Sequence, residues 1–153
     1  MLFHKIKKIK NNESVSISIS KSHVKGKENS YILDATNSAG EKIGLAIFFM
    51  NDKFGYLMNI IIQDKSYLGQ GLGSAMLESL EDFLFLKGIK KINGSFIPTI
   101  DDNMGYTYDS AFKLYYTHGY EFDDDDFYGT SISKHLTKLN DKNSSLITQK
   151  ELQ

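Results

Sequence analysis

YLGQGLGSAML, residues 67–77, places glycine at positions 69, 71 and 73, directly before a stretch with helical periodicity. Glycine inside a regular element costs about 0.5–1 kcal/mol relative to alanine, because the chain loses more conformational freedom when it becomes ordered. Three glycines at the entrance to a helix therefore need a reason. Two reasons are open: another group approaches the backbone closely there, or a tight strand-to-helix turn forms without any ligand.

The segment after the glycines has the periodicity of an amphipathic helix. Apolar residues recur at three- and four-residue steps, and acidic residues occupy the other faces; the apolar positions are Leu72, Ala75, Met76, Leu80, Phe83 and Leu84. Gly88 is typical of a helix end. The sequence predicts a helix over about residues 71–87.

The chain before the glycines is typical of strands. In SVSISIS, residues 14–20, apolar residues alternate with serine, as in a half-buried strand. Residues 31–36, 42–50 and 56–63 follow, separated by short turn-forming segments. These three segments predict an antiparallel meander.

The chain after the first helix predicts a strand, a helix and a final strand pair. The strand occupies residues 89–98 and precedes a polar loop over residues 99–108. A second helix is expected over about residues 109–118, capped by Asp109 or Ser110 and ended by Gly119. Two strands around an acidic connection complete a single domain of residues 1–137. Residues 138–153 form a polar tail, which we expect to be disordered or loosely helical.

Composition excludes several classes of function. The chain of 153 residues has a formal net charge of −1 and no cysteine. Nucleic acid is not an expected partner, and disulfides, thiolate nucleophiles and cysteine-based zinc sites are ruled out. The four histidines lack metal-ligand spacing, so no metal site is expected. No apolar run is long enough to span a membrane, and we expect a cytoplasmic protein. The basic run at residues 5–10 is interpreted as a solvated edge, in preference to a phosphate-binding arm.

The glycines restrict the chemistry at the start of the helix. A helix N-terminus presents unpaired N–H groups and the positive end of the dipole, which together favour an anion such as a phosphate. The Walker A loop needs a Gly-Lys-Ser/Thr ending, which is absent here. The dinucleotide-binding fingerprint needs G-x-G-x-x-G between parallel strands, whereas this chain has G-x-G-x-G after an antiparallel meander.

Residues 56–120 resemble the GCN5-related N-acetyltransferase (GNAT) superfamily. Its pyrophosphate motif, Arg/Gln-x-x-Gly-x-Gly/Ala, falls on residues 68–73. Its second motif, Ala-x-x-Leu-Tyr-x-x-x-Gly-Phe, falls on AFKLYYTHGYEF, residues 111–122, with Tyr120 in the phenylalanine position. Two motifs in register are more specific than either one alone.

The resemblance implies a fold, a co-substrate and a set of site residues. The fold is mixed α/β, with a largely antiparallel sheet that splays after the fourth family strand. The co-substrate is acetyl-CoA, and Tyr115 would donate a proton to its leaving thiolate. The cofactor-binding residues would be Ile61, Ile62 and Gln63 for the pantetheine arm and Leu68, Gly69, Gln70, Gly71, Leu72, Gly73 and Ser74 for the pyrophosphate.

The chain also departs from the family pattern. Leu68 stands where the motif has arginine or glutamine, and the stretch from Ile62 to Leu68 is one residue longer than usual. Many relatives carry a glutamate on the strand before the glycines, whereas Asn59 is the central polar residue here. About ten residues separate Ser20 from Tyr31, too few for the first two family helices at about 1.5 Å per residue.

Two acidic segments bear on the acceptor. Asp101 and Asp102 are candidates for the base that deprotonates an amine, although loop carboxylates are more often simply solvated. Asp123–Asp126 is interpreted first as a solvated turn and second as an attraction for a cationic acceptor. The acceptor cleft would be open, or would be completed by residues 100–108 or by the partner in a homodimer.

The resemblance therefore implies transfer of an acetyl group from acetyl-CoA to an amine, on a small molecule or a protein, by direct attack in a ternary complex. The alternative is a catalytically idle module that binds or senses acyl-CoA. A transferase with another acyl group or an alcohol acceptor is also open.

Overall fold

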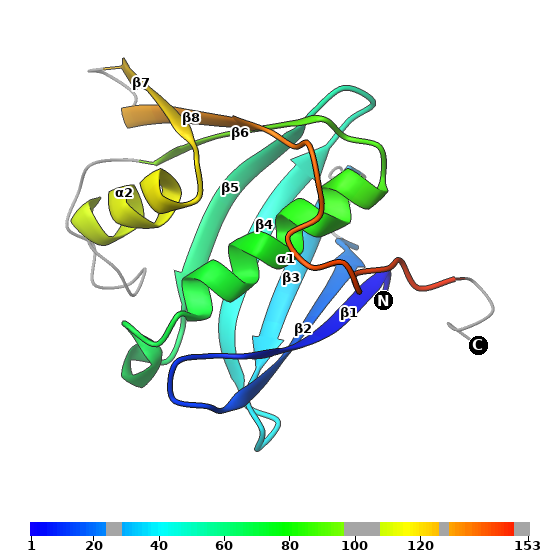
Figure 1. Ribbon diagram of the computed structural model, residues 1–153, viewed down its shortest axis with the longest axis vertical. Helices are drawn as coiled ribbons and strands as arrows, with labels where there is room; N and C mark the ends of the chain where they lie inside the picture. The colour runs from blue at the N-terminus through cyan, green and yellow to red at the C-terminus, as the bar shows by residue number, and fades with distance from the viewer. Residues whose placement is uncertain (24–28, 97–107, 126–128, 149–153) are drawn as a thin grey trace.

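The computed structural model describes residues 1–23, 29–96, 108–125 and 129–148. The described chain forms one eight-stranded sheet with two α-helices and one 3₁₀ turn (Figure 1). The elements are β1 Phe3–Lys8, β2 Ser14–Lys21, β3 Ser30–Thr36, β4 Lys42–Met50, β5 Gly55–Ile62, η1 Lys65–Tyr67, α1 Leu72–Leu86, β6 Lys91–Phe96, α2 Tyr108–Thr117, β7 Glu121–Asp125 and β8 Gly129–His135. Both helices lie within one residue of their predicted bounds.

The sheet has the order β1-β2-β3-β4-β5-β6-β8-β7. Neighbouring strands from β1 to β5 are antiparallel, β5 and β6 are parallel, and β6, β8 and β7 are again antiparallel. The parallel pair is the one whose strands are connected through α1, as a crossover requires. The mixed α/β fold and the predicted meander are confirmed.

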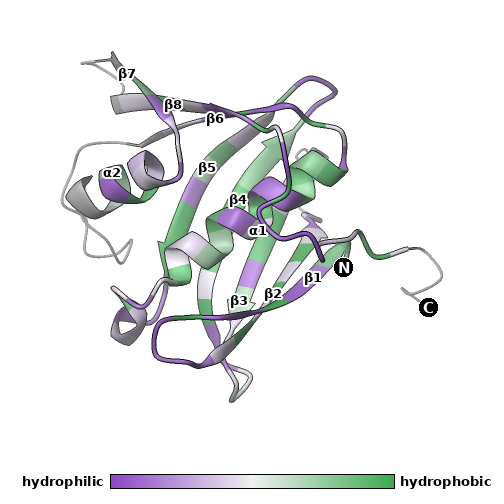
Figure 2. Ribbon diagram, viewed as in Figure 1, coloured by the Kyte–Doolittle hydropathy of each residue, from purple (hydrophilic) through white to green (hydrophobic). Residues whose placement is uncertain are grey.

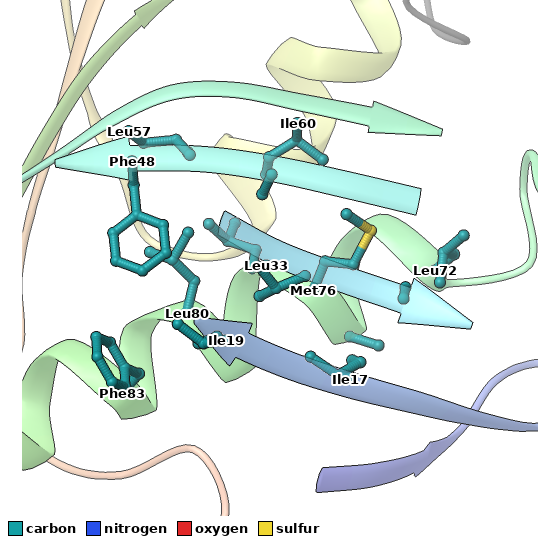
Figure 3. Packing of buried hydrophobic residues seen from close by; sticks show 14 of the residues in the cluster. Ile17, Ile19, Leu33, Phe48, Leu57, Ile60, Leu72, Met76, Leu80 and Phe83 are labelled. Atoms are coloured by element: carbon teal, nitrogen blue, oxygen red, sulfur yellow. The ribbon is translucent and has the colours of Figure 1, made fainter. Parts of the chain in front are cut away.

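The main core lies between α1 and the inner strands of the sheet. Ile17 and Ile19 are fully buried, as the alternation with serine predicts. The ring of Phe83 on α1 packs edge-on against Phe48 on β4 and Phe3 on β1. Figure 3 shows Ile17, Ile19, Phe48 and Phe83 meeting between helix and strands. Figure 2 shows hydrophobic and hydrophilic bands alternating along α1.

A β-bulge lies in β5 directly after the residues that pair with β6. In the β4–β5 ladder Ile47 is paired with Asn59 but Phe48 is paired with Leu57, so Met58 is the extra residue. A bulge bends its strand and increases the local twist. β5 pairs with β6 only over residues 55–57, and Figure 1 shows the two strands diverging beyond that point, with α2 beside the opening. The predicted splay is therefore present.

Between β2 and β3 lie only residues 22–29. At about 1.5 Å of rise per residue, this length cannot hold two helices. The expectation that the first two family helices are missing agrees with these strand bounds.

The described part of the C-terminal tail, residues 138–148, packs against α1 and β1. Asp82 on α1 is buried, and its carboxylate accepts hydrogen bonds from the amides of Asn140 (2.6 Å) and Asp141 (3.1 Å) and from Oγ of Ser144 (2.8 Å). A buried carboxylate needs such donors, because loss of its water shell is costly. Leu146 forms a β-bridge to Phe3 on β1.

Candidate functional site

The glycine loop has a conformational requirement of its own. Gly69 and Gly71 have φ of +77° and +84°, in the left-handed region that residues with a side chain rarely adopt. Gly73 lies inside α1, where a Cβ would be 3.4 Å from Cδ2 of Leu114 on α2. The turn therefore needs left-handed conformations at two of the glycines, whereas a Cβ on the third would be in ordinary van der Waals contact with Leu114.

The N-terminus of α1 has no side-chain cap. Gly71 is the N-cap residue, and the first helical hydrogen bond runs from the amide of Ala75 to the carbonyl of Gly71 (3.1 Å). The amides of residues 72–74 therefore have no acceptor within the helix. Bare amides combined with the positive end of the helix dipole make a site for an anion.

A groove of about 550 Å³ runs from this N-terminus along the splayed end of β5 to α2. Its lining comes from the β1–β2 turn, β5, the glycine loop, α1 and α2 and is, in chain order, Lys10, Ile60, Ile62, Leu68, Gly69, Gly71, Gly73, Ser74, Ala111, Lys113, Leu114, Tyr115 and Thr117. The groove thus joins the uncapped N-terminus of α1 to an apolar part of β5.

Seven of the predicted site residues line this groove together. They are Ile62, Leu68, Gly69, Gly71, Gly73, Ser74 and Tyr115. Leu68 is 39% exposed, so the position at which the family motif has a polar side chain carries an apolar one at the groove wall.

Four predicted residues are not among the groove-lining residues. Ile61 alternates with the lining residues Ile60 and Ile62 on β5, and Leu72 is fully buried in the core. The amide of Gln63 donates to the carbonyl of Ile43 (2.8 Å). The carbonyl of Gln70 accepts from the amide of Lys10 (2.8 Å). Any contact of these four with a ligand stays a prediction.

Tyr115 is nearly buried and borders the groove. Its exposed fraction is 3%, and its ring packs edge-on against Tyr120 with centroids 5.3 Å apart. The neighbouring Tyr116 is 67% exposed. Of the two adjacent tyrosines, Tyr115 is therefore the one whose position allows contact with a ligand in the groove.

Tyr120 and Glu81 form a buried polar cluster behind Tyr115. The hydroxyl of Tyr120 donates to Oε2 of Glu81 at 2.7 Å, and Nζ of Lys134 donates to Oε1 at 3.0 Å. Burial, and then the Glu81 carboxylate, raise the pKa of Tyr120 well above its usual value. Tyr120 therefore remains protonated and keeps its hydroxyl on Glu81.

An ion pair connects the end of α2 to α1. Nε2 of His118 lies 3.7 Å from Oε1 of Glu78, and Nζ of Lys7 lies 3.7 Å from Oε2 of the same carboxylate. Interaction with Glu78 raises the pKa of His118, and interaction with His118 lowers the pKa of Glu78. The helix α2, which carries Tyr115, is thus attached to α1 partly by a His118–Glu78 contact whose strength depends on pH.

Six residues that line the groove were not predicted as site residues: Lys10, Ile60, Ala111, Lys113, Leu114 and Thr117. Lys10 comes from the turn between β1 and β2, and Lys113 comes from α2. The basic run at residues 5–10 was the only signal for Lys10, and it was interpreted as a solvated edge. Ile60 was missed because the bulge at Met58 changes the register at which β5 faces the groove.

The structure describes only some of the acidic residues that the sequence offered as candidates for acceptor binding or catalysis. Asp101, Asp102 and Asp126 lie outside the described residues. The prediction of a turn at Asp123–Asp126 is wrong for its first three residues, which belong to strand β7 and pair with β8. Asp123 is exposed and borders a different hollow of about 420 Å³, lined by residues of β5, β6, β7 and β8. Within the described ranges, no three histidine or acidic side chains gather as metal ligands would. Neither described helix has the length and apolar character needed to cross a bilayer.

Comparisons with known proteins agree with this architecture. The S. lividans PAT GNAT domain superposes with a TM-score of 0.67 at 13% identity, over 87% of this chain and 97% of that one. PaiA N-acetyltransferase from Thermoplasma acidophilum, solved in complex with coenzyme A, gives a TM-score of 0.59 at 18% identity, over 70% of this chain and 61% of that one. The ribosomal-protein-S18-alanine N-acetyltransferase from Escherichia coli gives 0.56 at 20% identity, over 75% and 74%.

These identities establish a shared fold and nothing finer. No curated protein sequence matches the chain. The model of the acetyltransferase (GNAT) family, however, matches residues 8–104, which is more than half of the 153 residues. That match spans β2 to β6 and includes the glycine loop. The chain belongs to the acetyltransferase (GNAT) family.

Proposed function

We propose that the chain binds acetyl-CoA in the groove and transfers its acetyl group to an amine. The observation that carries the proposal is the uncapped N-terminus of α1 in a groove that Tyr115 also lines. Bare amides and left-handed glycines fit a diphosphate, and the apolar wall at Ile60 and Ile62 fits a pantetheine chain. The similar PaiA N-acetyltransferase was solved in complex with coenzyme A, and the similar protein from Escherichia coli is a ribosomal-protein-S18-alanine N-acetyltransferase.

The chemistry needs a neutral amine and a protonated leaving group. The amine nitrogen attacks the thioester carbonyl carbon, a C–N bond forms, and the C–S bond breaks. The Tyr115 hydroxyl gives its proton to the departing thiolate, and the proton lost by the amine restores that hydroxyl through solvent or a base. The products are the amide and coenzyme A, so atoms and charge balance. Action in the cytoplasm remains part of the proposal.

Two successive measurements test the proposed function. Calorimetry with acetyl-CoA measures binding, and a thiol-detecting assay then follows coenzyme A release with a panel of polyamines, aminoglycosides and peptide amines. The proposal expects saturable binding and amine-dependent thiol release. Failure to bind acetyl-CoA would overturn it.

A second candidate is a module that binds acyl-CoA without turnover. Leu68 in place of a polar motif residue and Asn59 in place of a strand glutamate favour this candidate, because both remove groups that relatives use. Tight binding without thiol release across the whole panel would select it over the transferase.

A further inference from the structure

The turn between β1 and β2 is attached to the glycine loop at two places. The amide of Lys10 donates to the carbonyl of Gln70 at 2.8 Å. At the other end of the turn, the carboxylate of Glu13 accepts from the hydroxyl of Tyr67 at 2.9 and 3.1 Å. Two separate hydrogen-bonded links of this kind hold the turn in a defined position against residues 67–71.

Backbone hydrogen bonds within the β1–β2 turn also fix its conformation. Asn12 has a φ of +66°, a conformation that asparagine tolerates better than most residues. The amide of Asn12 donates to the carbonyl of Ile9 (2.9 Å), and the amide of Ile9 donates to the carbonyl of Glu13 (3.1 Å). The backbone of Lys10 is therefore positioned before any ligand arrives.

The side chain of Lys10 extends over the glycine loop. Its Cγ and Cε lie 3.6 and 3.9 Å from the point where a Cβ on Gly71 would be, and the residue lines the groove. Two lysines on the preceding strand β1 have carboxylate partners: Lys5 pairs with Asp141, and Lys7 with Glu78. Lys10 has no carboxylate partner among the residues that the structure describes.

Position 68 carries no side chain that could bind a phosphate, so the charge of a diphosphate would have to be balanced by another residue. Leu68 presents an apolar, 39% exposed side chain at the same end of the groove. The helix N-terminus supplies only about half an elementary charge, whereas a diphosphate carries about two. A lysine ammonium near the bare amides would offset part of that difference.

We infer that Lys10 supplies the cation that contacts the diphosphate of acyl-CoA, in place of the polar residue missing at position 68. The inference rests on the proposed acyl-CoA function and adds a specific residue to it. The β1–β2 turn is the device that positions this ammonium, and its two links to the glycine loop keep the cation and the helix N-terminus in register.

The test compares Lys10→Gln with Lys8→Gln, a matched change of an exposed lysine on the same hairpin. Calorimetry measures the Kd for coenzyme A and for dephospho-CoA, which keeps the diphosphate but lacks the 3′-phosphate. Lys10→Gln should weaken both ligands by the same factor, roughly 3- to 30-fold. The loss should shrink as salt is raised, because ions screen an exposed charge pair. Lys8→Gln should leave both Kd values within about twofold.

Position 68 offers a complementary variant. Leu68→Arg in the Lys10→Gln protein should recover most of the lost affinity, because it returns a cation to the same end of the groove. Lys10→Arg alone should bind nearly as well as the parent, because the charge is kept.

The possible outcomes distinguish a failure of the Lys10 assignment from a failure of the proposed acyl-CoA binding. If the parent protein binds neither ligand, the acyl-CoA proposal fails. If the parent binds and Lys10→Gln binds equally well, or if its loss disappears with dephospho-CoA, the assignment of Lys10 to the diphosphate is overturned while the function stands.

Discussion

The hydroxyl of Tyr120 donates a hydrogen bond to Oε2 of Glu81 at 2.7 Å, and both side chains are at least 95% buried. Tyr120 stands where the family motif has phenylalanine. The extra hydroxyl is therefore matched by a carboxylate on α1, which also accepts from Lys134 (3.0 Å) and from Nδ2 of Asn140 (2.9 Å). The departure from the family motif at Tyr120 is thus matched by Glu81, which lies 39 positions away along the chain.

Tyr120→Phe, although it restores the family residue, should destabilise this chain. It removes a donor from a buried carboxylate, at a cost of about 1–3 kcal/mol in the free energy of unfolding. Urea denaturation monitored by circular dichroism measures the loss. Tyr116→Phe changes an exposed ring and should alter stability by less than about 0.5 kcal/mol. Equal stability of the parent and Tyr120→Phe would contradict this account.

Features that depend on local pattern were predictable from the sequence. Val15, Ile17 and Ile19 are all fully buried, because a strand places alternate residues on one face. The first helix ends close to Gly88, whose φ is +84°, because glycine accepts the left-handed conformation there. The glycine loop and Tyr115 were found through two motifs whose spacing reflects this local structure.

Features that depend on distant contacts were not predictable. Nothing in the local sequence marks Met58 as a bulge, yet the bulge decides that Ile60 and Ile62, and not Ile61, face the groove. Lys10 and Gly71 lie far apart along the chain, and sheet pairing together with the Lys10–Gln70 and Tyr67–Glu13 hydrogen bonds brings them together. A polar segment such as residues 138–148 likewise gives no sign that its amides satisfy a buried aspartate.

The glycine loop can be tested without losing the fold. Gly71→Asn should fold, because asparagine tolerates a positive φ, but its side chain would occupy the space over the helix N-terminus. We expect the Kd for coenzyme A to rise by at least about tenfold, or about 1.4 kcal/mol, measured by calorimetry.

Gly40→Asn is the matched control for backbone strain. Gly40 has a φ of +82° and lies in the turn between β3 and β4, away from the groove. It should cost similar stability and leave the Kd for coenzyme A unchanged. If both variants bind coenzyme A like the parent, the anion site at α1 is wrong.

The ion pair between His118 and Glu78 should make stability depend on pH. The pKa of His118 is raised above 6.5, so its contribution is complete below pH 6.5 and is lost as pH rises through the folded-state pKa. The pKa of Glu78 is lowered below 4.5, so its contribution is complete above pH 4.5 and is lost as pH falls through the folded-state pKa.

The pair therefore stabilises most between about pH 4.5 and 6.5. Because both side chains are partly exposed, we expect His118→Gln to cost only about 0.5 kcal/mol in that range and less at pH 8.5. Urea unfolding of both proteins at pH 5.5 and 8.5 measures the difference. A loss of stability that is the same at both values would assign His118 a packing role instead.

The position of Tyr115 predicts its effect on turnover. It is 3% exposed, lines the groove and follows Leu114 in the second family motif. Loss of a general acid typically costs 10²–10⁴-fold in rate, and a thiolate is already a tolerable leaving group. We expect Tyr115→Phe to lower kcat by about 10²-fold in a thiol-release assay at saturating acetyl-CoA. Because phenylalanine keeps the ring against Tyr120, the Kd for acetyl-CoA should change by less than about twofold.

Tyr116→Phe, with its exposed ring, should keep full turnover and serves as the control. The pH profile distinguishes the roles further: an acid with a tyrosine pKa gives a fall in kcat at high pH that the phenylalanine variant lacks. A Tyr115→Phe protein that turns over like the parent, or that loses activity only because it unfolds, would make this tyrosine a packing residue.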